Sequence, residues 1–223
     1  MSRARAYLDY NATAPVRPAV AESVARALTL PGNPSSIHAE GRAARAALEA
    51  ARTEVAGLVN ARPEQVVFTS GGTEAANAVL SGALRRRGDA APTRLLHSAT
   101  EHPCVAAGHR FPDAAVQEVP VTADGVVDLA ALEARLAALT DETLLLSVHA
   151  ANNETGAVQP LAEIVGCSRA HGRALVHSDP VQAAGQHPLA MATLRLDALA
   201  LSGPKFAAPQ RGGVPVPDPK SAV

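Results

Sequence analysis

The sequence predicts an α/β fold in which a mostly parallel sheet is flanked by helices on both faces. Short apolar runs alternate along the chain with longer amphipathic segments, as in proteins that cover a sheet with helices. Continuous apolar runs such as Leu144–Leu146 are typical of strands buried on both faces. The 223 residues are enough for one sizeable core, so we expect a single α/β domain.

The predicted strands are short runs rich in Leu, Val and Ala. They cover residues 65–69, 94–97, 115–119, 143–148, 174–177 and 196–201. Ligands of an open α/β sheet bind beyond the carboxyl ends of its strands. Polar residues that follow these runs are therefore the first candidates for a site.

Three longer segments predict helices. In residues 41–60, apolar side chains recur at spacings of three and four and form one stripe. Asp128 is a suitable cap for a second helix, which begins at Leu129. Pro160 fits the first turn of a third helix, and Gly172 is its expected stop.

The ends of the chain differ from its middle. Residues 210–223 carry three prolines at alternate positions and no clear period, which predicts an irregular tail. We therefore expect an N-terminal segment at residues 1–16, one large domain at residues 17–209, and this tail.

Composition excludes several classes of function. The formal net charge of -1 gives no electrostatic reason to expect nucleic acid or an anionic membrane as partner. No apolar run reaches the roughly 18 residues of a membrane span. Cys104 and Cys167 cannot build a disulfide framework, and the first ten residues lack a signal sequence, so we expect a cytoplasmic protein. No residues have the spacing of a zinc site.

A glycine turn follows the first predicted strand. Gly72 allows the backbone to approach an anion, the next amides begin a helix, and Thr73 adds a hydroxyl. The turn lacks the lysine of a P-loop, which argues against a nucleotide site. A plain strand-to-helix turn fits the same sequence.

Two further segments place polar side chains after strands. His102 could stack on a planar ring or move protons, or it could simply cap the next helix. Asn153 follows the most apolar strand and could bind a ligand through its amide, although asparagines there also suit a tight turn.

The last two strands end at an acid and an amine. Asp179 could pair with a pyridinium nitrogen, or it could cap a short helix. Lys205 could form an imine if desolvation or nearby positive charge lowered its pKa, whereas an exposed surface lysine is the alternative.

In their order along the chain, six motifs resemble those of cysteine desulfurases, which belong to the class V aminotransferase superfamily of pyridoxal-phosphate enzymes. The resemblance spans about residues 7–209. The motifs are Tyr7–Pro15, Gly32–His38, Phe68–Glu74, Glu101–Pro103, Asn152–Gly156 and Ser202-x-x-Lys205.

The resemblance implies a large domain of the fold type I class, with pyridoxal 5'-phosphate as cofactor. Lys205 and His102 would be catalytic, through a Schiff base and through ring stacking with proton transfer. The other implied cofactor contacts are Gly72, Thr73 and Ser202 to the phosphate, Asn153 and Gln182 to the ring or substrate, and Asp179 to the ring nitrogen.

The activity implied by the resemblance is conversion of L-cysteine to L-alanine, with the sulfur passed on for iron–sulfur cluster or other sulfur-cofactor assembly. A homodimer and a sulfur-acceptor or scaffold protein are the implied partners. Two alternatives stay open: another class V enzyme such as a selenocysteine lyase, and a non-catalytic module for cofactor binding or dimerisation.

Three departures from the family pattern bear on activity. Pro204 stands where the family has histidine, which removes a phosphate contact of about 1.5–3 kcal/mol. Pro180 replaces the usual alanine after Asp179 and is expected to affect the orientation of that side chain. The chain also ends before the family's small C-terminal domain, so we expect a truncated chain with impaired turnover.

Overall fold

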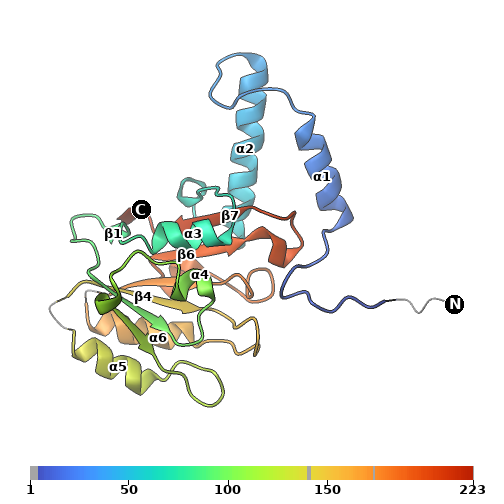
Figure 1. Ribbon diagram of the computed structural model, residues 1–223. Coiled ribbons are helices and arrows are strands. Elements are labelled where there is room, and N and C mark those ends of the chain that lie inside the picture. Colours follow the sequence, from blue (N-terminus) through green and yellow to red (C-terminus); the bar gives the residue numbers. More distant parts are fainter. Residues whose placement is uncertain (1–4, 140–141, 173, 223) are drawn as a thin grey trace.

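The computed structural model of the chain describes residues 5–139, 142–172 and 174–222 (Figure 1). Residues 1–4 of the predicted N-terminal segment and Val223 of the predicted tail lie outside this range. The helices are α1 (Pro18–Leu28), α2 (Ala39–Leu58), α3 (Gly72–Val79), α4 (Pro103–Ala106), α5 (Leu129–Ala137), α6 (Leu161–Ala170) and α7 (Met191–Leu194).

The predicted mostly parallel sheet is confirmed. Within the described residues it has six strands in the order β3-β2-β4-β5-β6-β7, and only β7 runs antiparallel to its neighbour. The strands are β2 (Arg94–Ser98), β3 (Val116–Val119), β4 (Leu144–His149), β5 (Ala174–Asp179), β6 (Ala198–Ser202) and β7 (Gly213–Pro217). A separate small pair is formed by β1 (Arg85–Arg86) and β8 (Ser221–Ala222).

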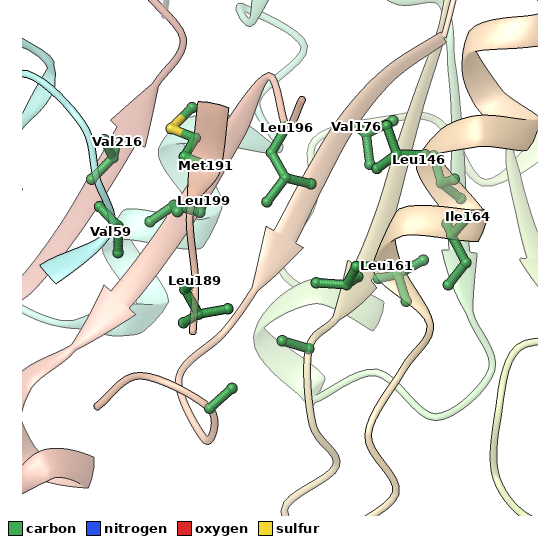
Figure 2. Packing of buried hydrophobic residues seen from close by; sticks show 14 of the residues in the cluster. Val59, Leu146, Leu161, Ile164, Val176, Leu189, Met191, Leu196, Leu199 and Val216 are labelled. Carbon is green, nitrogen blue, oxygen red and sulfur yellow. The ribbon is translucent and has the colours of Figure 1, made fainter. Parts of the chain in front are cut away.

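Alternation along the central strands divides the core between the two faces of the sheet. Leu145 and its neighbours in register on β2 and β5 pack with α3 and α4 on one face. Leu146 and its neighbours in register pack with α5 and α6 on the other face. Figure 1 shows helices on both sides of the sheet, and Figure 2 shows the larger of the two clusters around Leu146, Ile164 and Val176.

The expected helix ends agree closely with the structure. The imidazole of His38 accepts a hydrogen bond from Gly41 N and caps α2, so this histidine begins the long helix. Asp128 caps α5 by accepting a hydrogen bond from Ala131 N at 3.1 Å. The third helix, α6, follows Pro160 and ends before Gly172, whose φ of +73° suits glycine.

The prediction of an irregular tail is wrong, because residues 213–217 form strand β7 and bury Val214 and Val216. The prolines alternate, so their missing N–H groups all lie on the side of β7 that faces away from β6. On that side, the oxygen of Pro215 still accepts a hydrogen bond from Val67 N at 3.2 Å.

The strand predicted at residues 65–69 is also only partly present. Pro63–Gln65 is a turn of 3₁₀ helix. Thr69 N donates a hydrogen bond of 2.8 Å to the oxygen of Gly213, and the pair forms an isolated bridge rather than a full strand. The run therefore borders β7 along part of its length, which brings the glycine turn to the end of the sheet.

The N-terminal helices project from the body of the fold in Figure 1. None of the residues of α1 is buried, and Leu8, Leu28 and Ile37 in this region are exposed. The end of α2 anchors the pair, since Ala56 and the following Val59 are buried in the larger core cluster. No helix in the described ranges is long and apolar enough to cross a membrane.

Candidate active site

A cavity of about 610 Å³ opens where β4, β5 and β6 end, a size suited to a small ligand. Residues from six separate stretches of the chain line it. Among the lining residues are all eight predicted site residues: Gly72, Thr73, His102, Asn153, Asp179, Gln182, Ser202 and Lys205.

The glycine turn offers this cavity an anion-binding helix end. The amides of Gly72 and Thr73 begin α3, where the first N–H groups have no partner within the helix. A Cβ placed on Gly72 would lie 2.8 Å from the Cβ of Ser202. Only glycine lets the turn approach Ser202 this closely, so the two predicted phosphate contacts lie side by side.

Strand β7 supports the same turn from behind. A Cβ on Gly213 would lie 2.1 Å from the backbone carbon of Gly71, so the two chains touch at this point. Gly212 N donates a hydrogen bond of 2.9 Å to the oxygen of Ser70. The segment that sequence reasoning left irregular therefore fixes the position of the turn.

Asp179 is a buried acid without a cation partner. The residue is 7% exposed and forms no ion pair with any described residue. Its Oδ1 accepts a hydrogen bond from Val181 N, and the thiol of Cys104 lies 3.9 Å from its Oδ2. Burial raises the pKa of Asp179 to about 6, and the charge of Glu101 adds to the shift. A cation such as a protonated pyridine nitrogen would supply the missing partner.

Lys205 is held inside the site and is not an exposed surface lysine. It follows β6 in a short 3₁₀ helix, Gly203–Phe206, and is half-buried. Its Nζ donates hydrogen bonds of 2.9 and 2.8 Å to the backbone oxygens of Asn11 and Ala12. Gln182 Nε2 donates to the same oxygen of Asn11 at 3.0 Å.

His102 both caps a helix and lies in the candidate site. Its Nδ1 accepts a hydrogen bond of 3.1 Å from Cys104 N, so it caps α4, and it also lines the cavity. Because Nδ1 accepts, the proton of the neutral ring is on Nε2. Burial and the charge of Lys205 lower the pKa of His102, which keeps the ring neutral and able to take a proton.

The two asparagines after β4 have different roles: one forms a turn and the other lines the cavity. The side chain of Asn152 forms the tight turn, accepting hydrogen bonds from Glu154 N and Thr155 N. Asn153 lines the cavity, and its backbone oxygen accepts a hydrogen bond of 2.9 Å from Asn11 Nδ2. The N-terminal segment is thereby fastened to the far side of the site.

The two prolines that depart from the family pattern leave the cavity intact. After Pro180 the chain turns, and both Asp179 and Gln182 still line the cavity. The oxygen of Pro204 accepts a hydrogen bond of 3.0 Å from Ala14 N, and the residue does not line the cavity. Pro204 supports the N-terminal segment through its backbone, and its side chain offers no hydrogen bond to a phosphate.

Sequence reasoning missed several lining residues. Asp9, Asn11 and Ala12 belong to a motif that carried the resemblance, but no site residue was predicted in it. Cys104 and His149 lie beside predicted residues at strand ends, and that position was the available signal. In the ranges that the structure describes, no three His, Cys, Asp or Glu side chains gather as a metal site would require.

An amine and an unpaired buried acid that share one cavity are what a pyridoxal-phosphate protein offers its cofactor, and this fold and site define that class. The family model described as Aminotransferase class-V matches residues 6–216. The chain belongs to this family, whose members use pyridoxal phosphate, and the resemblance read from the motifs is confirmed.

Named relatives agree with this assignment. The chain is 39% identical over 210 residues to an IscS-like cysteine desulfurase of Mycobacterium tuberculosis, covering 92% of this chain and 53% of the relative. It is also 39% identical over 214 residues to cysteine desulfurase IscS of Salmonella arizonae, covering 92% and 51%. The chain thus spans about half the length of the curated relatives it matches.

Solved structures show the same fold. A NifS-like protein from Rickettsia africae superposes with a TM-score of 0.83 at 31% identity, over 95% of this chain and 57% of that one. The structure described as SspA in complex with cysteine gives a TM-score of 0.82 at 29% identity, over 94% and 60%. The predicted α/β large-domain fold is therefore confirmed.

Proposed function

We propose that the chain is the cofactor-binding part of a cysteine desulfurase that converts L-cysteine to L-alanine and transfers the sulfur. One observation carries the proposal: all eight residues predicted for the cofactor line a single cavity, with Lys205 and Asp179 both among them. The relatives named as cysteine desulfurases and the relative solved with cysteine favour this substrate over other amino acids.

The residues around the cavity fit pyridoxal phosphate. The amides of Gly72 and Thr73 and the hydroxyl of Ser202 would bind the phosphate. Asp179 would hold the proton of the ring nitrogen, and the cofactor bound there would act as an electron sink. Asn153 and Gln182 would contact the ring or the substrate.

The remaining chemistry falls to two side chains. Lys205 Nζ would hold the cofactor and would leave its two carbonyl partners on doing so. Once the substrate amine takes its place, the freed amine of Lys205 would move a proton at the substrate α-carbon. His102 would assist, since its ring is kept neutral and carries a proton on Nε2. Both groups would therefore act as catalytic residues.

The wider role belongs to the same proposal. The released sulfur would serve iron–sulfur cluster or other sulfur-cofactor assembly in the cytoplasm, through an acceptor or scaffold protein. We also propose a homodimer, because large apolar side chains of the N-terminal region, such as Leu28 and Ile37, are exposed in the single chain. The proposed domain limits are residues 1–16, 17–209 and 210–223, and since β7 belongs to the six-stranded sheet, the last part packs as an extension of the large domain.

The test of the proposal is an assay of the purified chain with pyridoxal phosphate and L-cysteine. We expect a visible absorbance band from bound cofactor. With an excess of a dithiol, which accepts the sulfur and reduces it to sulfide, we expect slow formation of alanine and sulfide. Lys205→Ala should abolish the band. The chain has only one other lysine, Lys220, which is exposed and lies outside the cavity, so Lys220→Ala is the matched control. Absence of the band in the unaltered chain would contradict the proposal, and a band without alanine would leave a binding module.

A further inference from the structure

A buried acid and a buried histidine lie next to Asp179 and have no part in the chemistry proposed above. His149 is the last residue of β4 and is in register with Asp179, the last residue of β5. Side chains in register on neighbouring parallel strands project from the same face of the sheet. Both line the cavity, so the imidazole lies beside the acid.

Glu101 reaches His149 from the loop after β2. Its side chain is 0% exposed, and its Oε1 accepts hydrogen bonds of 2.6 and 3.0 Å from the backbone N and the Nδ1 of His149. Its other oxygen, Oε2, is buried and has no hydrogen-bond partner among the described residues. A buried carboxylate oxygen without a hydrogen bond is costly unless a positive charge lies near it.

Gln159 settles which nitrogen of His149 carries the proton. Gln159 Oε1 accepts a hydrogen bond from Val127 N at 2.9 Å, and its Nε2 donates to the oxygen of Gly125 at 2.8 Å. These two backbone contacts fix the orientation of the amide. Its Nε2 lies 3.3 Å from His149 Nε2 and can only donate to it. The proton of His149 is therefore on Nδ1 and points at Glu101, and the ring is neutral.

Several elements bring titratable groups near Asp179. The loop after β2 brings Glu101, whose charge raises the pKa of Asp179. Helix α4 brings the thiol of Cys104, and β4 brings the ring of His149, whose Nε2 accepts from Gln159. His102 and Lys205 also line the cavity. Since His149 does not neutralise Glu101, the acid at position 179 has a second negative charge near it.

We propose that Glu101, His149 and Gln159 are positioning residues, which hold a second negative charge beside Asp179 and so keep the ring nitrogen of the bound cofactor protonated. The inference rests on the proposed function for the identity of the ligand. A like charge nearby raises the proton affinity of Asp179, and both charges favour a cation in front of them. The Glu101 charge would therefore strengthen the binding of a protonated ring.

The first test needs no cofactor. We expect ¹⁵N NMR of the apo chain to show the His149 proton on Nδ1, and Gln159→Met to give a mixture of both tautomers. Carbon NMR of labelled aspartate should show that Glu101→Gln moves the pKa of Asp179 down toward its ordinary value. Glu118→Gln, at an exposed position of β3, should leave it unchanged. A proton on Nε2 in the unaltered chain, or an Asp179 pKa that Glu101→Gln does not move, would overturn the inference.

The second test uses pyridoxal phosphate itself. Glu101→Gln should weaken cofactor binding roughly tenfold, and the pH at which the visible band changes should fall. Glu118→Gln should match the unaltered chain. If the unaltered chain fails to bind the cofactor, the proposed function fails. If the unaltered chain and Glu101→Gln bind the cofactor with equal affinity, only the positioning role is overturned. Should Glu101→Gln not fold, the tautomer measurement on the unaltered chain still decides.

Discussion

The ammonium group of Lys205 donates a hydrogen bond of 2.8 Å to the backbone oxygen of Ala12, 193 residues earlier in the chain. A second bond, of 2.9 Å, goes to Asn11. The side chain expected to react with the cofactor thus also holds the N-terminal segment across the cavity, so loss of the amine should loosen that segment.

Lys205→Ala should therefore increase hydrogen exchange near the site. The reporters are Thr13 N, bonded to Asp9, and Ala14 N, bonded to Pro204. Loss of two charged hydrogen bonds, each about 1.5–3 kcal/mol, predicts exchange at least about tenfold faster. Lys220→Ala is the control, and equal exchange in the two variants would show that Lys205 does not hold the segment.

Asp179→Asn should change how stability depends on pH. The folded pKa of Asp179, about 6, lies above its ordinary value of 3.8, so folding favours the protonated acid. The cost of ionising Asp179 in the folded chain lowers stability. This loss is absent below about pH 4 and complete above about pH 6. The asparagine variant should gain up to about 3 kcal/mol over the parent at pH 7 and little at pH 4. Urea unfolding at both values measures this, and a gain independent of pH would refute it.

Gly72→Ala should destabilise the chain by about 1–3 kcal/mol and weaken cofactor binding, because its Cβ would collide with Ser202. Gly71→Ala is a close control, since a Cβ there meets nothing within 4 Å and its φ of 177° suits any residue. Urea unfolding and cofactor titration of both variants make the comparison. Equal losses in the two would contradict the close approach of Gly72 and Ser202.

The two thiols should differ in reactivity. Burial raises the pKa of Cys104 to about 12, and the charge of Asp179 contributes. Burial and Glu133 also raise the pKa of Cys167, whose thiol lies near the surface. Alkylation at mildly alkaline pH, followed by mass spectrometry, should modify Cys167 first. Faster labelling of Cys104 would mean that its thiol is not held as the structure shows.

The sequence predicted the central strands well, because they depend on local patterns. The eight predicted site residues line one cavity, and their roles, some of which only the family resemblance implied, stay predictions. Apolar runs such as Leu144–Leu146 predict buried strands. A parallel sheet brings the carboxyl ends of its strands together at one edge. Strand β7 is not predicted, because closely spaced prolines are typical of irregular segments, although their spacing of two puts every missing N–H of β7 on one side.

Other features needed contacts that no local pattern contains. The bond from Lys205 to Asn11 joins opposite ends of the chain. The bond from Gln159 to His149 joins residues on either side of the turn that follows β4. The burial of Glu101 likewise depends on β4, whose last residue His149 donates hydrogen bonds to it. These contacts decide which charges face Asp179, so they could be found only in the folded chain.

The central claim is that Lys205 is the amine that holds the cofactor. Borohydride reduction of the chain with pyridoxal phosphate, followed by peptide mass spectrometry, tests this directly, since Lys220 is the only other lysine in the sequence. We expect the label on Lys205 and none on Lys220. Label on Lys220 alone, or equal label on both, would contradict the account.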